Sequence, residues 1–213
     1  MRGVFVTGTD TNAGKTVVSA ALMVRFPGMR YWKPIQTGSD DDTAEVLRLS
    51  DLPSAAAYHH GVRLPDPVSP HLAASRARTR IDVGSHAASI KEMDEKWIIE
   101  GAGGALVPVN ESDLMVHLME RLGLPVLIAA RSTLGTINHT LLTIEALRAR
   151  RLTIAGVVMV GQPDADNRAA IEQYGYVEVL GEMPRFDPLT PAALRDWAPL
   201  SLDPGGRLQE FFQ

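Results

Sequence analysis

Apolar and polar positions along this chain follow two patterns that predict two kinds of element. Short apolar runs predict six strands, at Val4–Thr7, Arg30–Ile35, Trp97–Glu100, Val126–Ala130, Ile154–Val160 and Val177–Leu180. Between them, apolar residues three and four positions apart predict six helices, at Lys15–Arg25, Asp42–Leu49, Asp82–Glu95, Ser112–Leu122, Thr136–Arg150 and Asp164–Tyr174. Runs that are apolar throughout, such as Val126–Ala130, are typical of parallel strands covered on both faces. The sequence therefore predicts an α/β, doubly wound fold with a mostly parallel sheet and helices on both faces.

The composition limits the class of protein and its location. The chain has 213 residues, no cysteine, a net charge of −4, 45% hydrophobic residues and 22% charged residues. These values are typical of an ordinary globular protein, so we expect a single domain over residues 1–213. The lack of cysteine excludes disulfides and cysteine-ligated metals, and the charge gives no signal for nucleic acid. Because the chain enters a strand at once and has no bilayer-length apolar run, we expect a cytoplasmic protein without a membrane role.

The first predicted strand leads through a turn of glycine and small polar residues, Gly8–Thr16, into the first predicted helix. In this arrangement backbone N–H groups at a helix N-terminus face an anion, and the helix dipole favours its negative charge. Gly14 lets the backbone approach phosphates, Lys15 adds a positive charge, and the Thr16 hydroxyl suits Mg²⁺. Five residues separate Gly8 from Gly14, one more than in the common pattern. We predict a phosphate-binding loop, with a simple βα turn as the alternative.

Three more charged residues occupy positions at which such folds bind ligands. Lys33 lies at the far end of the second strand, and the carboxyl ends of parallel strands face the ligand crevice. Asp42 opens a helix after an acidic run, and Glu100 ends an apolar strand before a glycine-rich turn. Since Mg²⁺ prefers a few carboxylates together with phosphate oxygens, both acids are candidate metal ligands. The alternatives are that Lys33 is a solvated lysine, that Asp42 belongs to a solvated acidic loop, and that Glu100 is an incidental glutamate in a turn.

Other polar segments have simpler interpretations. Ser69 and Pro70 fit the N-cap and first residue of a helix, so capping accounts for both without a ligand. Small polar residues at Arg131–Asn138 open a long helix, where they normally cap it but can equally hold a carboxylate. The six histidines show no recognisable zinc spacing.

Six segments of the chain carry a family resemblance. They are Gly8-Thr9-Asp10-Thr11 with Gly14-Lys15-Thr16, Tyr31–Gly38, Pro67–His71, Glu100–Gly104, Leu134–His139 and Gly181–Pro184. In this order they resemble the dethiobiotin synthetase family, including the extra residue of its signature loop. Any one segment is a weak match, whereas the ordered set is highly specific.

The resemblance implies a P-loop NTPase-like fold and a cyclo-ligase that forms C–N bonds. The family joins CO2 to 7,8-diaminononanoate and closes the ureido ring of dethiobiotin, using ATP and Mg²⁺. One amine forms a carbamate, whose oxygen takes the γ-phosphoryl group of ATP. The other amine then attacks the carbamic–phosphoric anhydride and expels phosphate. The expected partners are thus the diamine, CO2 or bicarbonate and ATP, with the site at a homodimer interface.

The resemblance also implies roles for individual residues. Lys15, Lys33 and Thr11 are expected to be catalytic, and Thr16, Asp42 and Glu100 to hold Mg²⁺. The residues expected to bind nucleotide are Asn12, Ala13, Gly14, Lys15, Thr16, Val17, Asp42, Glu100, Gly101, Ala102, Gly103, Gly161, Met183, Pro184 and Arg185. The residues expected to bind the diamine are Thr37 and, from the partner subunit, Gly135, Thr136 and Asn138. Val160-Gly161 stands where the family often has an adenine-reading asparagine, so the base selectivity is open.

The alternative function is a switch ATPase of the chromosome-partitioning or septum-positioning type, which shares the fold and the position of the loop. Such proteins carry an additional lysine early in the loop, and residues Gly8 to Ala13 contain none. They also often add a basic or amphipathic surface for DNA or membrane, and the sequence has neither. A nucleotide-binding module without catalysis is a third hypothesis, which Lys15, Lys33 and Glu100 together disfavour.

Overall fold

A seven-stranded parallel sheet forms the centre of the computed structural model, which describes residues 1–213. The strand order is β4-β2-β6-β1-β7-β8-β9, and every neighbouring pair is parallel. The strands of this sheet are β1 (Arg2–Gly8), β2 (Arg30–Trp32), β4 (Ala57–Tyr58), β6 (Lys96–Gly104), β7 (Val126–Arg131), β8 (Ile154–Val160) and β9 (Val179–Met183). The predicted α/β class with a mostly parallel sheet is confirmed.

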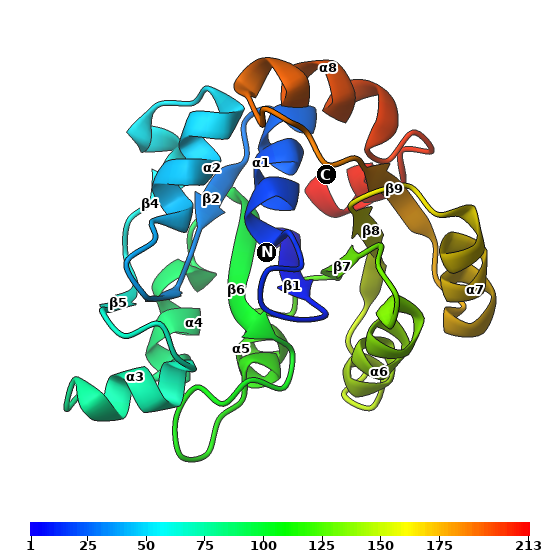
Figure 1. Ribbon diagram of the computed structural model, residues 1–213. Helices are drawn as coiled ribbons and strands as arrows, with labels where there is room; N and C mark the ends of the chain where they lie inside the picture. The colour runs from blue at the N-terminus through cyan, green and yellow to red at the C-terminus, as the bar shows by residue number, and fades with distance from the viewer.

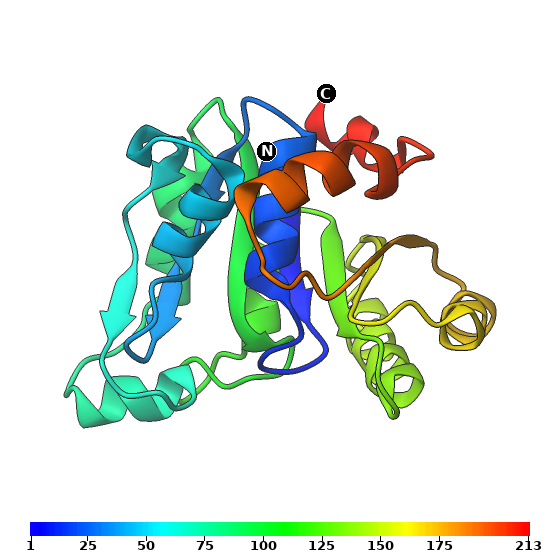
Figure 2. The same cartoon turned by 45° about the horizontal axis from the view of Figure 1, so that its top comes forward.

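Helices cover both faces of the sheet, as Figures 1 and 2 show. One face packs against α1 (Lys15–Arg25), α2 (Asp42–Ser50), α8 (Pro191–Ser201) and the 3-10 helix η2 (Arg207–Phe212). The other packs against α3 (Pro70–Arg76), α4 (Val83–Lys91), α5 (Met115–Leu122), α6 (Thr136–Arg148) and α7 (Ala165–Gly175). Alternate residues of β1 divide between the two cores, with Val4 and Val6 on the α1 face and Phe5 on the other. The fold is therefore doubly wound, as predicted.

The predicted strand Arg30–Ile35 is wrong as a single element. It divides into β2 and β3 (Ile35–Thr37), and β3 pairs with β5 (Val62–Leu64) in a separate two-stranded sheet. The break falls at Pro34, which has no N–H to donate to a strand ladder. The Pro34 carbonyl instead accepts a hydrogen bond from the Val62 N–H, 2.9 Å away. This small sheet carries the segment after β2 away from the central sheet and over the end of the strands.

Several other predicted boundaries differ from the structure. The helix predicted from Ser112 begins at Met115, because the Asn110 side chain accepts the N–H groups of Ser112 and Asp113. The last strand, β9, begins two residues later and ends three residues later than the predicted Val177–Leu180. The helix α8, which the sequence analysis did not predict, begins at Pro191 after the N-cap Thr190. The short 3-10 helix η1 (Ser54–Ala56) was not predicted either.

The direction of the connections locates the ligand crevice. After β1 the chain turns through α1 towards β2 and β4, whereas after β6 it crosses β1 to reach β7. In doubly wound sheets, ligands bind at the carboxyl ends of strands where the connections diverge in this way. The ends of β1 and β6 are therefore the expected location of the site. No helix of the protein is long and apolar enough to span a membrane.

Candidate active site

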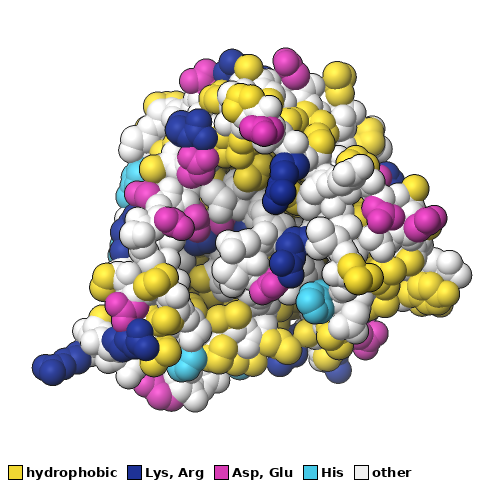
Figure 3. Space-filling view, viewed as in Figure 1, with side chains coloured by type: hydrophobic (Ala, Val, Ile, Leu, Met, Phe, Trp, Pro, Cys, Tyr) yellow, Lys and Arg dark blue, Asp and Glu magenta, His cyan; other side chains and the backbone are white.

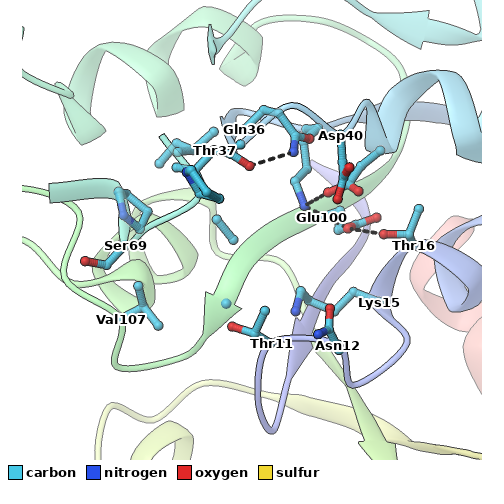
Figure 4. A pocket seen from close by; sticks show the side chains of 18 of the residues that line it. Thr11, Asn12, Lys15, Thr16, Gln36, Thr37, Asp40, Ser69, Glu100 and Val107 are labelled. Carbon is cyan, nitrogen blue, oxygen red and sulfur yellow. Dashed lines mark hydrogen bonds and ion pairs between the residues drawn. The ribbon is translucent and has the colours of Figure 1, made fainter. Parts of the chain in front are cut away.

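A cavity of about 670 Å³ lies at the carboxyl ends of β1, β2 and β6. Its walls come from the β1–α1 loop, the segment from Lys33 to Asp42, the end of β6 and the loop before α3. In the space-filling view, charged side chains surround the hollowed middle of this face (Figure 3). In the close view, Thr16 and Glu100 face each other, and Ser69 and Val107 lie across the cavity from them (Figure 4). The cavity thus brings together residues from distant parts of the chain.

The β1–α1 turn has the backbone of a phosphate-binding loop. Gly14 has a φ of +93°, which favours glycine, and a Cβ there would lie 2.9 Å from the Val160 side chain. The helix α1 follows directly and no side chain caps its N-terminus. The Lys15 ammonium folds back over the loop and donates to the Asp10 carbonyl, 3.1 Å away. Asp10 in turn pairs with Arg131 at the end of β7, at 2.9 Å. The first turn of α1 is therefore open for an anion.

Strand register brings Lys33 beside Glu100. Trp32 of β2 pairs with Ile99 of β6, so the next residues along each strand, Lys33 and Glu100, are neighbours. Side chains of a strand alternate between faces, and Tyr31 and Ile98 belong to the core under α1. Lys33 comes two residues after Tyr31, and Glu100 comes two residues after Ile98. Both side chains therefore point to the same face. That face also carries Thr16, the second residue of α1.

The carboxylate of Glu100 is the centre of a buried hydrogen-bond network. It is fully buried, and its Oε1 accepts from Thr16 Oγ1 at 3.0 Å and from Lys33 Nζ at 2.8 Å. Its Oε2 accepts from the Tyr31 hydroxyl at 2.9 Å. Lys33 also pairs with Asp42 Oδ2 at 2.6 Å and donates to the Gly101 carbonyl at 3.1 Å. Three side chains, those of Thr16, Tyr31 and Lys33, thus converge on one carboxylate.

Burial and neighbouring charges set different protonation behaviour for the two lysines. Burial and the Lys33 ammonium lower the pKa of Lys15 to about 8. Burial also acts to lower the pKa of Lys33, but the Glu100 and Asp42 carboxylates outweigh it, and the net effect raises that pKa. Burial and the Glu100 carboxylate raise the pKa of Tyr31 well above its usual value, so its hydroxyl remains a donor. Lys33 therefore keeps its charge, whereas the lowered pKa of Lys15 is about 8.

This difference predicts proton uptake when a nucleotide binds. A triphosphate next to Lys15 favours the ammonium form, so at pH 9 binding should take up about 0.9 proton for a group with a pKa near 8. Below pH 7 the uptake should vanish, and above pH 8 the affinity should fall about tenfold per pH unit. Calorimetry in buffers of different ionisation enthalpy measures the uptake. The variant Lys15→Met should show none, and an equal uptake in this variant would assign the proton to another group.

The residues predicted as metal ligands form an all-oxygen set. Thr16, Asp42 and Glu100 supply one hydroxyl and two carboxylates, and the Lys33 ammonium lies between the two carboxylates. That ammonium shows that the pocket accommodates a cation at this point. No group of three histidine, cysteine, aspartate or glutamate side chains is close enough to bind a metal alone. The set fits Mg²⁺, which is usually held by one or two carboxylates together with substrate phosphates and water.

The acidic run before α2 divides its tasks among three residues. Asp41 caps the helix by accepting from the Ala44 N–H and pairs with Arg63 at 2.8 Å. Asp40 lines the cavity and is exposed. Asp42 alone of the three pairs with Lys33. The interpretation of the run as a solvated loop therefore holds for Asp40 and Asp41 but not for Asp42.

The far wall of the cavity contains residues that the sequence analysis set aside. Ser69 occupies the N-cap position of α3, but its hydroxyl makes no cap hydrogen bond and pairs with His71 Nδ1 at 3.0 Å. Capping therefore does not account for this serine, which lines the cavity together with Val68 and Val107. Gln36 also lines it, and its amide donates to the Thr37 carbonyl at 3.2 Å. Thr37, the predicted diamine contact, lies on this side of the cavity.

The glycines after Glu100 pack closely against other parts of the protein. A Cβ at Gly101 would lie 2.9 Å from the Phe5 ring, and one at Gly103 would lie 2.7 Å from Val107. These positions need glycine because the protein itself packs against them. Gly101 offers its carbonyl to Lys33 and does not line the cavity, whereas Ala102 and Gly103 do line it.

A second cavity of about 880 Å³ adjoins the first, and several residues expected to bind nucleotide line it. Asn12 and Val17 line both cavities, so the two meet over the start of α1. The second is lined in part by Gly161, Gln162, Met183, Pro184 and Arg185. The Gly161 N–H is already bound to the Met183 carbonyl at 2.9 Å.

Some predicted residues line neither cavity. Ala13 is fully buried inside the loop. Gly135, Thr136 and Asn138 lie at the start of α6 and line neither of these two cavities. Thr11 lines the first cavity and also a third one of about 490 Å³ between the loop and α6.

Comparison with known proteins gives a consistent result. Residues 2–193 match a family model described as an AAA domain. The chain is 51% identical over 201 residues to an ATP-dependent dethiobiotin synthetase of Paramagnetospirillum magneticum, covering 93% of this chain and 96% of that protein. It is 45% identical over 194 residues to an ATP-dependent dethiobiotin synthetase of Rhodopseudomonas palustris, covering 90% of each chain.

Solved structures with a similar fold are more distant in sequence. A ParA family ATPase from Chlorobium tepidum superposes with a TM-score of 0.58 at 12% identity, covering 100% of this chain and 98% of that one. A cell division ATPase MinD from Pyrococcus furiosus superposes with a TM-score of 0.56 at 18% identity, covering 99% of this chain and 96% of that one. At these identities the likeness shows the P-loop fold alone.

Proposed function

The chain belongs to the dethiobiotin synthetase family of ATP-dependent ligases, and from this we propose that it carboxylates 7,8-diaminononanoate with CO2 and closes the ureido ring of dethiobiotin. The reaction consumes ATP and uses Mg²⁺. The observation that carries the proposal is the convergence of Lys33, Glu100 and Thr16 on one cavity, with the loop lysine Lys15 in its wall. Phosphoryl transfer needs chiefly positioning and neutralisation of charge, and these groups supply both.

The proposed chemistry has three steps. A neutral amine of the diamine attacks CO2 and loses a proton, which gives a carbamate. A carbamate oxygen attacks the γ-phosphorus of ATP, the bond to the β-phosphate oxygen breaks, and ADP leaves. The second amine then attacks the carbonyl carbon of the mixed anhydride, loses a proton and expels phosphate. Each of the last two steps moves negative charge onto phosphate oxygens, which cations stabilise.

The residues of the cavity suit these steps. Lys15 and the backbone N–H groups at the start of α1 bind the phosphates, and Thr11 completes this cradle. Lys33 is a permanent cation beside the cavity and stabilises the carbamate and the transferred phosphoryl group. Thr16, Asp42 and Glu100 would hold Mg²⁺, which supplies charge neutralisation at the β- and γ-phosphates when bound.

The opposite wall suits a small diamine with an apolar chain. Val68 and Val107 contribute apolar surface, and Thr37 offers a hydroxyl. The small sheet of β3 and β5 ties this wall together, because the Gly38 N–H donates to the Leu64 carbonyl at 3.0 Å. The diamine would thus lie between this wall and Lys33, with one nitrogen near Thr37.

We also propose a homodimer in which Gly135, Thr136 and Asn138 of the partner subunit hold the substrate carboxylate. The α6 helix starts at Gly135 without a side-chain cap, so its N-terminus can accept an anion. Leu134 beside it is fully exposed, and Leu106 and Leu142 near the third cavity are also exposed. A two-fold contact over this surface would cover the three leucines.

Subunit mixing tests this arrangement. Two variants, Lys33→Met and Asn138→Asp, should each be nearly inactive alone, the second because its carboxylate repels that of the substrate. Mixed in equal amounts and allowed to exchange, they should recover about one quarter of wild-type activity, since half of the dimers have one intact site. No recovery after proven exchange would place both groups in sites of a single subunit.

The proposed activity is tested by incubating the protein with 7,8-diaminononanoate, ¹³C-bicarbonate and Mg-ATP. The expected product is dethiobiotin with one ¹³C atom in its ureido carbonyl, detected by mass spectrometry, with one ADP and one phosphate released per product. The switch-ATPase alternative predicts phosphate release that does not depend on the diamine. The ParA and MinD structures share the fold, but residues Gly8 to Ala13 lack the additional loop lysine expected of that class.

A further inference from the structure

We propose that Tyr31 is a positioning residue that orients the Glu100 carboxylate so that Oε1 alone is presented to the metal and nucleotide. This inference rests on the proposed function, because it concerns how the same site prepares its metal ligand. Nothing in the family resemblance assigns a role to this side chain. The inference comes from the contacts that divide the two oxygens of Glu100.

The two carboxylate oxygens have different partners. Oε1 faces the cavity and accepts from Thr16 at 3.0 Å and from Lys33 at 2.8 Å. Oε2 faces the interior and accepts from the Tyr31 hydroxyl at 2.9 Å. When the carboxylate turns about its last bond, Oε2 must leave Tyr31. The tyrosine therefore holds the carboxylate in the orientation that directs Oε1 towards Thr16.

The packing around Tyr31 fixes its hydroxyl in place. Tyr31 is fully buried on the α1 face of the sheet, within the core that includes Val18, Leu22 and Ile98. Its hydroxyl makes no other hydrogen bond, so moving away from Glu100 would leave a buried polar group without a partner. Because the ring cannot move without disturbing this core, the donor position is rigid.

A rigid donor to Oε2, the oxygen that faces the interior, has a recognisable consequence. Partners that orient a metal ligand without touching the metal typically change metal affinity or activity by about 10–100-fold when removed. Loss of the Tyr31 hydroxyl should therefore weaken the contribution of the metal to nucleotide binding. It should leave untouched the part of the affinity that comes from the loop and Lys15. This separation distinguishes orientation of Glu100 from a general structural role.

The test uses Tyr31→Phe, which removes one hydroxyl and keeps the ring. The affinity for a non-hydrolysable ATP analogue is measured by calorimetry with Mg²⁺ and with EDTA, and Mn²⁺ binding to the nucleotide complex by electron paramagnetic resonance. We expect the gain in affinity from Mg²⁺ to fall about tenfold, with the EDTA value unchanged. The matched control is Tyr58→Phe, whose ring packs beside Trp32 with centroids 5.9 Å apart and which does not contact Glu100.

A double variant shows whether the effect passes through Glu100. In Glu100→Gln the gain from Mg²⁺ should already be small, and adding Tyr31→Phe should lower it no further. The inference is overturned if Tyr31→Phe keeps the wild-type gain in nucleotide affinity from Mg²⁺, or if it loses as much affinity with EDTA as with Mg²⁺. It is also overturned if the two substitutions lower the gain additively in the double variant.

The outcomes also separate this inference from the proposed function. A wild-type protein that makes dethiobiotin, combined with a Tyr31→Phe variant that keeps its full Mg²⁺ effect, rejects the role of Tyr31 alone. If the wild-type protein makes no dethiobiotin but the Tyr31→Phe variant loses the gain in affinity from Mg²⁺, the ligase activity is rejected and the role of Tyr31 is retained.

Discussion

The variant Lys33→Met is expected to form dethiobiotin about 10²–10³-fold more slowly than the wild type, the range found when one preorganised transition-state donor is removed. Methionine keeps an unbranched side chain that is one atom shorter, and it removes the charge and the donors. Lys33 is the cation that contacts both Glu100 and Asp42 and lines the cavity. Because the loop and Lys15 remain, the KM for ATP should change far less than kcat. Steady-state kinetics with the diamine saturating measures both.

The control is Lys91→Met, which removes an exposed lysine at the end of α4. Removal of Lys33 also leaves two neighbouring carboxylates without their buried counter-ion, and breaking such a pair costs about 3–5 kcal/mol. Thermal unfolding with Mg²⁺ and nucleotide present therefore accompanies the kinetics, and only folded protein is counted. A folded Lys33→Met protein with wild-type kcat would remove the catalytic role of this lysine.

The variant Glu100→Gln is expected to lower kcat/KM for Mg-ATP by about 10–100-fold, since a charge-assisted contact is worth about 1.5–3 kcal/mol. Glutamine preserves the shape of the side chain but removes its charge. The Mg²⁺ concentration for half-maximal activity should rise, because one of the two carboxylates proposed to hold the metal becomes neutral. A titration of activity against free Mg²⁺ at fixed ATP measures the shift.

An exposed glutamate provides the comparison for this variant. Glu92→Gln, at the end of α4, removes the same charge far from the cavity and should behave as the wild type. If Glu100→Gln showed an unchanged Mg²⁺ requirement, the carboxylate would be a structural partner of Lys33 and not a metal ligand.

The parts of this site that the sequence predicts are those encoded locally. The loop Gly8–Thr16 is recognisable because the glycines, Lys15 and Thr16 are contiguous and stand between a strand and a helix. Lys33 and Glu100 are each recognisable as charges at the end of an apolar strand. Their contact was not predictable, because it joins residues 67 positions apart and depends on the register of β2 against β6.

The remaining parts depend on tertiary structure. The role of Tyr31 needs the register and the face on which its ring is buried, and a tyrosine in a strand is otherwise an ordinary core residue. Ser69 has the sequence of a helix cap, and only the structure shows that its hydroxyl makes no cap hydrogen bond and that the residue lines the cavity. The sequence analysis predicts one strand over Arg30–Ile35 because apolar residues continue to Ile35. The structure has two strands there, since Pro34 cannot donate to a strand ladder.

The most direct test of the whole account is a crystal structure with Mg²⁺, a non-hydrolysable ATP analogue and the diamine bound together. We expect the Lys33 ammonium within hydrogen-bond distance of the terminal phosphate or of the carbamate, and Mg²⁺ bound by Thr16, Asp42 and Glu100. The diamine should lie along Thr37 and Val68. A complex in which the diamine binds elsewhere, with Lys33 still held only by Asp42 and Glu100, would contradict the account.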